Sequence, residues 1–450
     1  MTIRSRCCNA VVLPPRVSHG FFLTMTALLL GGIFLGSAVA DELADQESLL
    51  IARISNGRSD NQPAEAEQPS VEIQSQSESE SATARRIHYH ASLGVRQVYD
   101  DNINISNSNR ESDFYTTIEP SIDVSIGSLD GNFVALTYSP NAYIFAEHSE
   151  NNAIQHIISI SGQYRFPLLT LSLTQDIEIL DGTGLTTATG TGTDFTRTNL
   201  DVSGRTRLNL YNTRLNANYS LTGKTFLTGG LSYSISDYPS LISSSVLSGD
   251  FYFNYTYSPK LSLGIGLAGG YDFVEAPSED QSFEQLNARL SYELTGKVSA
   301  TFSAGVEFRQ VSGSNESDNG SPVFEGTLFY QPFDGTNLAM TLSRRTLNSA
   351  ALSAQDFHST SVIVSARQRF LQRIYFGLTV GYENSSYFST TAGISANRDD
   401  DYFFIQTSFD LNLTSFWTAG FYYFYRESDS SLDLFSFYDN QFGFRTTVQF

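Results

Sequence analysis

Between residues 87 and 450 the chain alternates apolar and polar side chains with a period of two, almost without interruption. In the segment 113–127, Phe114, Ile118 and Ile122 fall on one face, and Glu119 and Asp123 fall on the other. Period two is the spacing of a β-strand, because successive side chains point to opposite faces of a sheet. The pattern recurs in about 18 segments and predicts an all-β fold, with about 16 strands as the second choice.

The connections between these segments alternate in length. Even-numbered segments are followed by short turns such as 167–168 and 414–415, whereas odd-numbered ones are followed by longer polar loops such as 101–112 and 181–198. Outer-membrane barrels have this asymmetry, with short periplasmic turns and longer extracellular loops. Because lipid offers no partner for the backbone, such a sheet has to close on itself. The sequence therefore predicts one transmembrane antiparallel β-barrel over 87–450.

Two parts of the predicted barrel leave alternatives open. The apolar phase of segment 205–220 shifts between Leu210 and Leu215, which indicates either a bulge or a second strand. The loop 181–198 is rich in Gly and Thr, and it either folds inward as a constriction or stays on the surface.

The first 86 residues differ from the rest. Residues 21–38 form the long apolar run of the chain, three arginines precede it, and Ala38-Val39-Ala40 follows as a small-x-small sequence. This layout predicts a signal peptide over 1–40 that is cleaved near Ala40, with an uncleaved membrane helix as the alternative. Residues 41–86 are rich in Asp, Glu, Ser and Gln and too poor in apolar residues to fold, so we expect a disordered acidic periplasmic leader.

Composition excludes several classes of function. The formal net charge of −20 excludes a nucleic-acid binder that works through its overall field. The two cysteines, Cys7 and Cys8, precede the predicted barrel, so the barrel has no disulfide, zinc-thiolate site or thiol nucleophile. We expect no enzymatic activity, no cofactor and no metal.

Two sets of residues nevertheless suggest other chemistry. Asp100-Asp101-Asn102 and Asp399-Asp400-Asp401 offer clustered oxygen ligands of the kind calcium prefers, although solvated loop acids are the favoured interpretation. His358 lies between Asp356 and Ser359, but a catalytic triad depends on three-dimensional geometry and not on neighbours in sequence.

Charged residues on the predicted inner face are the candidate functional residues. They are Asp123, Glu178, Arg205, Arg207, Arg289, Glu307, Arg309, Arg367 and Arg369. The pairs Arg205/Arg207 and Arg367/Arg369 are each two residues apart, which places both members of a pair on one face of a strand. Such charges either pair across strands and brace the wall, or set a field across a pore.

The end of the chain, QFGFRTTVQF, resembles the C-terminal recognition strand of bacterial outer-membrane proteins. Phe442, Phe444, Val448 and the terminal Phe450 carry the resemblance. It implies an assembly signal that is read by the barrel-assembly machinery.

The opening of the predicted barrel carries a second resemblance. Tyr99-Asp100-Asp101-Asn102-Ile103, then Ser112-Asp113-Phe114 and Pro120, resemble the outer-membrane β-barrel porin family of the kind associated with bacterial exopolysaccharide gene clusters. The resemblance implies a porin-like barrel in the outer membrane of a Gram-negative-type bacterium, surrounded by outer-membrane lipid.

Three functions fit this fold. The first is a channel for small polar solutes or saccharides. The second is an outer-membrane component of an exopolysaccharide export apparatus, with periplasmic export partners, and the third is a closed structural or surface-interaction barrel. The substrate and the oligomeric state do not follow from the sequence.

Overall fold

The structure is a computed structural model of the 450-residue chain. It describes residues 87–128, 131–183, 200–312, 320–391 and 394–450. The predicted signal peptide with its cleavage site near Ala40, the predicted leader 41–86 and residues 184–198 of the predicted constriction loop lie outside the described residues.

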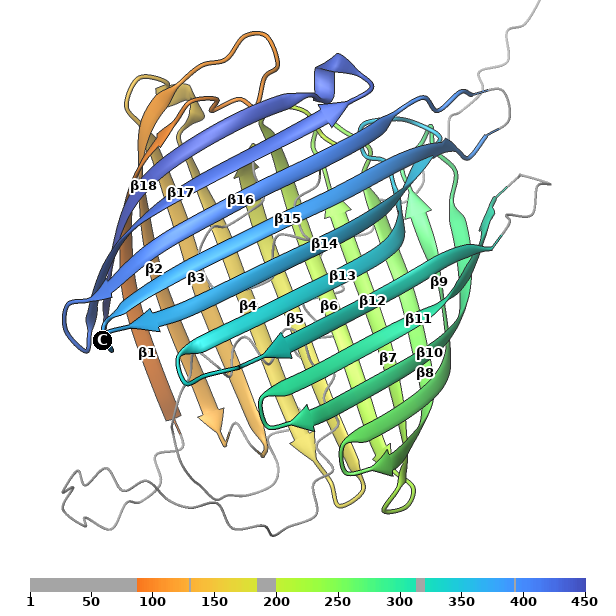
Figure 1. Cartoon of the computed structure of the whole chain (residues 1–450). Coiled ribbons are helices and arrows are strands. Elements are labelled where there is room, and N and C mark those ends of the chain that lie inside the picture. Colours follow the sequence, from red (N-terminus) through yellow and green to blue (C-terminus); the bar gives the residue numbers. More distant parts are fainter. Residues whose placement is uncertain (1–86, 129–130, 184–199, 313–319, 392–393) are drawn as a thin grey trace, which may run out of the picture. The chain divides into compact units, whose positions relative to one another are not determined.

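Eighteen antiparallel strands form one sheet that closes into a barrel, as the alternation predicts (Figure 1). The first nine are β1 (Ile87–Asp100), β2 (Asp113–Gly127), β3 (Phe133–Phe145), β4 (Ala153–Arg165), β5 (Leu169–Gly182), β6 (Thr206–Ser220), β7 (Thr225–Asp237), β8 (Ser244–Ser258) and β9 (Leu261–Val274). The others are β10 (Gln281–Thr295), β11 (Val298–Val311), β12 (Ser321–Tyr330), β13 (Thr336–Asn348), β14 (Gln355–Phe370), β15 (Ile374–Ser389), β16 (Asp399–Asn412), β17 (Trp417–Ser430) and β18 (Phe437–Gln449). Short 3₁₀ helices, η1 (Ser149–Asn151) and η3 (Asp433–Phe435), lie in two of the connections.

The two ends of the barrel differ as predicted. The turns after even-numbered strands gather at one end, the short-turn end, and the longer connections gather at the other, the long-loop end. Lysine side chains reinforce the short turns: Lys260 Nζ donates to the carbonyl of Leu294 at 3.0 Å, and Lys297 Nζ donates to that of Pro332 at 3.0 Å.

Strand β6 corrects one expectation. It pairs with β5 and β7 in continuous register, so the shift of phase between Leu210 and Leu215 marks neither a bulge nor a second strand. The physical reason is that Leu208 faces inward and packs against Tyr238 and Ala350. An apolar residue on the inner face breaks the alternation without bending the strand.

The outer face of the barrel is apolar. Large hydrophobic side chains such as Ile122, Leu267 and Phe421 are more than half exposed there. The inner face carries polar side chains at the alternate positions, for example the Asp123–Thr137 pair at 2.5 Å. Because every backbone group of a closed barrel is paired between strands, a hydrocarbon layer suits this outer surface. Among the described residues, no helix is long and apolar enough to cross a bilayer.

The last residue of the chain takes part in closing the barrel. The Phe450 amide donates to the Ala91 carbonyl at 2.7 Å, beyond the β1–β18 ladder. Phe442 and Phe444 are exposed on the outer face, and Val448 pairs with the outward-facing Leu93. Their role as an assembly signal stays a prediction.

Replacing Phe450 with Ala should reduce the fraction of chains that reach the folded barrel. The ring is exposed at the short-turn end, where it can contact lipid. Losing this contact lowers the stability of the folded barrel by roughly 1–3 kcal/mol, the free energy of burying an apolar side chain. The folded fraction is read from the shifted band of unheated samples on SDS gels. Leu371→Ala, in a short turn at the same end, is the matched control. Equal folded fractions for both variants and the wild type would contradict the assigned role of Phe450.

Candidate functional site

The interior of the barrel is packed at the long-loop end and open to water toward the short-turn end. On β17 the inward-facing Tyr422, Phe424 and Arg426 are buried, whereas Thr418 near the short turn is partly exposed. On β5, Leu180 is buried and Ser172 is partly exposed. The long-loop half of the interior therefore resembles a protein core, and the short-turn half a wetted wall.

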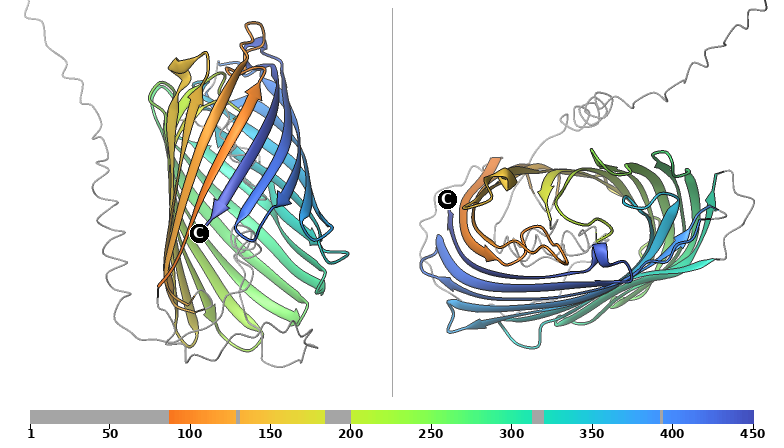
Figure 2. Two further views of the ribbon diagram at one scale, coloured as in Figure 1. Left: turned by 90° about the vertical axis from the view of Figure 1, so that its left-hand side faces the viewer. Right: turned by 90° about the horizontal axis from the view of Figure 1, so that it is seen from above.

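The β1–β2 connection closes part of the long-loop end from inside, where it turns toward the interior of the ring (Figure 2, right). Ile103 and Ile105 are 1% and 5% exposed and pack in one cluster with inward-facing residues of β1, β14, β16 and β17. Ile105 has a φ of 43°, in the left-handed region that β-branched residues rarely adopt. Asn102 holds the segment with a 2.8 Å bond from Nδ2 to the Tyr438 carbonyl. Packing and polar anchoring thus maintain a strained backbone at the mouth.

The end of the β5–β6 connection crosses the interior. Asp201 precedes β6, yet its carboxylate accepts hydrogen bonds from Ser349 Oγ at 2.7 Å and Tyr387 Oη at 2.9 Å. Arg398 donates to the Asp201 carbonyl at 3.0 Å and stacks on Phe435. Tyr387 lies on β15, halfway round the ring from β6. The carboxylate of Asp201 therefore ties two opposite walls together.

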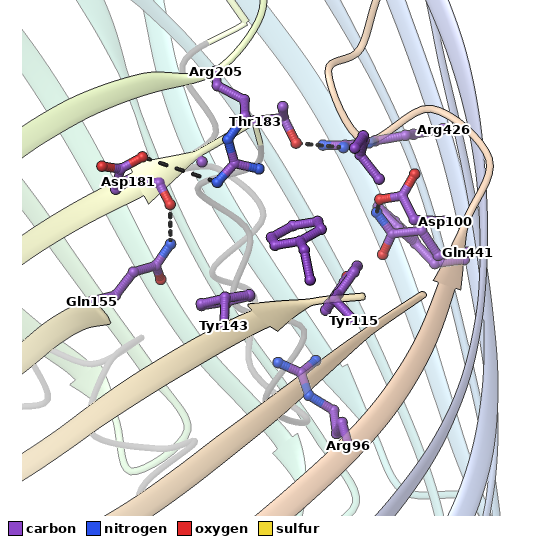
Figure 3. A pocket seen from close by; sticks show the side chains of 14 residues that line it. Arg96, Asp100, Tyr115, Tyr143, Gln155, Asp181, Thr183, Arg205, Arg426 and Gln441 are labelled. Atoms are coloured by element: carbon purple, nitrogen blue, oxygen red, sulfur yellow. Dashed lines mark hydrogen bonds and ion pairs between the residues drawn. The ribbon is translucent and has the colours of Figure 1, made fainter. Parts of the chain in front are cut away.

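A narrow polar gap remains between these inserted segments. It has a volume of about 60 Å³, and Arg96, Tyr115, Tyr143 and Arg205 line it. Figure 3 shows the guanidinium of Arg205 on one side of the two tyrosines and that of Arg96 on the other. Small-molecule binding pockets typically measure about 300–1,000 Å³. The gap, called the constriction below, therefore has room for a few water molecules and is too small to be a binding pocket for a sugar.

The arginines at the constriction differ in how well their charge is compensated. Arg96 Nε donates to Glu119 at 2.6 Å, and Arg426 Nε donates to Asp439 at 2.7 Å.

Arg205, by contrast, lies 4.0 Å from its nearest carboxylate, that of Asp181, and donates to the carbonyl of Asn151 at 3.2 Å. Burial lowers the pKa of Arg205, against the pull of Asp181. Arg205 is therefore the least closely paired of these three arginines.

Two of the predicted inner charges brace the wall. Arg289 donates to Asn254 at 2.7 Å and to Thr228 at 2.6 Å, so it spans from β10 to β7. Arg309 donates to Glu307 at 3.2 Å and to the Thr346 carbonyl at 3.4 Å. The second contact joins β11 to β13 where the shorter β12 leaves them unpaired.

The other predicted inner charges differ in exposure, because Glu178 is buried and the rest are partly or fully exposed. Glu178 faces inward near the constriction, and Asp123 lies in the wetted half. Arg367 stacks on Tyr375 near the short-turn end. Arg369, two residues further along the same face of the strand, is exposed. The Arg367/Arg369 pair therefore faces solvent inside the barrel, whereas Arg289 and Arg309 serve the wall.

Arg207 was assigned to the wrong face. On β6 the inward face carries Leu208 and Arg214, and Arg214 contacts Asp250 at 3.3 Å. Arg207 has the opposite parity and is exposed on the outer face. The error arose because apolar residues were expected on the lipid face. Leu208 is apolar but faces inward, so the adjacent Arg207 faces outward. Arg96, which is not among the predicted inner charges, also lies on the inner face, and the outward-facing Leu93 and Val95 are the signal that could have placed it there.

The structure does not assemble a hydrolytic triad around His358. Ser359 Oγ donates to Glu383 at 2.7 Å, and the Asp356 carboxylate accepts from Gln281 at 3.0 Å. His358 Nδ1 lies 3.3 Å from Thr346 Oγ1. Each member of the set thus has a different partner.

The acidic clusters are only in part the solvated loop acids expected from the sequence, because one acid of each cluster is buried while the acids that flank it are partly or fully exposed. Asp100 and Asp400 are both almost fully buried, because inserted connections cover them. Asp400 pairs with Arg398. Asp100 lies beside Asp101 and Asp439.

Comparisons with solved structures find other barrels at low similarity. The chain is similar to OccK2 of Pseudomonas aeruginosa, with 10% identity, a TM-score of 0.45, and coverage of 80% of this chain and 98% of that one. It is also similar to OccAB3 of Acinetobacter baumannii, with 10% identity, a TM-score of 0.41, and coverage of 80% and 99%.

OmpT, expressed in the outer membrane of Vibrio cholerae, has 9% identity, a TM-score of 0.35, and coverage of 81% and 97%. No protein-family model and no curated protein matches the chain. The functional conclusion therefore rests on the geometry of this chain.

Replacing Asp201 with Ala should destabilise the barrel. The change leaves the buried guanidinium of Arg398 with fewer partners and frees the Tyr387 hydroxyl, and breaking a buried charged pair costs roughly 3–5 kcal/mol. The measurement is the temperature at which the folded band disappears on unheated SDS gels. Asp399→Ala, an exposed acid at the same end, is the control. If both variants lose the folded band at the wild-type temperature, Asp201 does not hold the walls together.

Proposed function

We propose that the chain is a porin-like channel for small polar solutes or saccharides in the outer membrane of a Gram-negative-type bacterium. The observation that carries the proposal is the interior itself: a closed 18-stranded barrel with an apolar outside and a polar, partly solvent-exposed wall in its short-turn half. Barrels of about 16–18 strands are wide enough to leave an aqueous channel unless something fills them.

The proposal includes a location for selectivity. Solutes would enter the wetted half freely and meet their barrier at the constriction, where Arg205 is the least compensated charge. Charged side chains that line a narrow pore set its preference among ions. Arg367, which is partly exposed, and Arg369, which is exposed, lie near the short-turn end and would add to an anion preference.

A closed barrel is the second candidate, and a specific observation favours it. Ile103 and Ile105 fill the long-loop end like residues of a core. A barrel closed at this end would not conduct until the connection moved. The resemblance of the first strands to the exopolysaccharide-associated family supports a third role, in which the barrel is the exit of an export apparatus and periplasmic partners bind the leader.

Changing Arg205, Arg367 and Arg369 to Glu in one variant should shift the selectivity of the channel toward cations. Coulomb coupling to a passing ion about 4 Å away is about 1 kcal/mol in water and several-fold larger beside a wall of lower dielectric. The shift should be clear at about 0.1 M salt and shrink near 1 M, where the screening length falls to about 3 Å. Reversal potentials in planar bilayers measure it.

Arg207→Glu is the matched control, because Arg207 is two residues from Arg205 in the chain but lies on the outer face of the barrel. An equal shift from the control would show that inner charges do not set selectivity. A wild-type barrel that carries no current would refute the channel and support the closed barrel. A current that appears only after deletion of residues 41–86 would instead favour the export role.

A further inference from the structure

Three carboxylates meet where the first and last strands close the barrel. Asp100 ends β1, Asp101 follows it, and Asp439 lies on β18; one oxygen of each lies within 4.8 Å of the others. Asp100 is 3% exposed and Asp439 is fully buried. Figure 3 shows Asp100 beside Arg426 and Gln441.

The carboxylates of Asp100 and Asp101 have donors for each oxygen. Asp100 Oδ1 accepts from the Asn102 amide at 2.8 Å, and Oδ2 accepts from Gln441 Nε2 at 3.0 Å. Asp101 accepts from the amide and the side chain of Asn440 and pairs with Arg110 at 2.7 Å.

Asp439 is different, because only one of its oxygens has donors. Oδ2 accepts from Arg426 Nε at 2.7 Å and from Gln441 Nε2 at 3.0 Å. Oδ1 is buried and has no hydrogen-bond partner among the described residues. A buried polar atom without a partner is costly, and the cost is larger for a charged group. The cluster thus holds three carboxylates but pairs with two guanidinium groups, those of Arg426 and Arg110.

We propose that Asp100, Asp101 and Asp439 bind a divalent cation, with Asp439 Oδ1 as its buried ligand. The three proposed ligand atoms are all carboxylate oxygens, the ligand type that Ca²⁺ prefers. Two neighbouring arginines offset part of the negative charge, so we expect the weaker class of Ca²⁺ site, with a dissociation constant of about 10⁻⁴–10⁻³ M.

A cation at this position would stabilise the closure of the barrel. Asp100 and Asp101 begin the connection that carries Ile103 and Ile105 into the barrel, and Asp439 belongs to the last strand. One ion would therefore join the two strands that close the barrel and fix the inserted connection at its root. This inference does not depend on whether the barrel conducts.

A proton shared between Asp100 and Asp439 is the competing explanation. It would also satisfy Asp439 Oδ1, but it requires no metal. Calcium binding therefore separates the two.

The test is isothermal titration of CaCl₂ into the chelator-treated, folded full chain, with MgCl₂ as a comparison. We expect about one Ca²⁺ per chain at sub-millimolar to millimolar affinity and weaker binding of Mg²⁺, which tolerates irregular carboxylate geometry less well. Asp439→Asn should weaken Ca²⁺ binding at least tenfold. Asp401→Asn, which changes an exposed acid on β16 outside the cluster, should leave the binding unchanged.

Because Asp439 is buried, its variant must first show the folded band on unheated SDS gels. If it does not fold, Asp101→Asn, which removes a partly exposed ligand, replaces it with the same expected weakening. Absence of Ca²⁺ binding by the folded wild type would overturn the proposal. Wild-type Ca²⁺ affinity in the folded ligand variant would overturn it as well, since the ion would then bind elsewhere on the acidic surface.

Discussion

The pairing of β1 with β18 is the interaction on which the rest of the structure depends. Lipid offers no partners for backbone N–H and C=O groups, so the sheet is compatible with a membrane only when its last strand bonds to its first. The ladder runs from Ser92 opposite Gln449 to Asp100 opposite Gln441. The same register places Asp100 beside Asp439 and brings the β1–β2 connection to the mouth of the barrel. Closure and the packing of the interior are thus consequences of one seam.

The barrel follows from the sequence because its causes are local. Period-two alternation defines each strand, and the contrast between short turns and long loops defines the two ends. Both features survive in the structure with the predicted strand number. The lengths of the connections were informative because a barrel in a membrane has two different ends, whereas a soluble sandwich has no such requirement.

What the sequence did not disclose lies where the interior stops being a wetted wall. Val98 and Leu208 face inward because inserted connections cover them, so the rule that apolar residues face outward fails there. That failure misplaced Arg207.

The contact between Asp201 and Arg398 joins residues 197 apart in the chain, and no pattern in the sequence connects them. Such long-range contacts hold the inserted connections that frame the constriction, which explains why the wall was predictable and the candidate site was not.

The two halves of the interior also use charge differently. At the packed end, Arg96, Arg309 and Arg398 are buried and form ion pairs, so their interactions hold walls and connections together. Near the short turns, Arg367 and Arg369 face water and can act on solutes. Bracing and selectivity are therefore not alternatives for the whole barrel, because how closely a charge is paired decides which role it has.

An interior that is wet near the short turns and packed near the long loops can be tested directly with single cysteines, since the chain has none after Cys8. The barrel is placed in liposomes and exposed to a charged thiol reagent that does not cross lipid. We expect fast labelling of Ser161→Cys on the wetted inner wall, and protection of Ile103→Cys inside the mouth and of Ile122→Cys on the lipid face. Labelling of Ile103→Cys as fast as Ser161→Cys, or protection of Ser161→Cys, would contradict it.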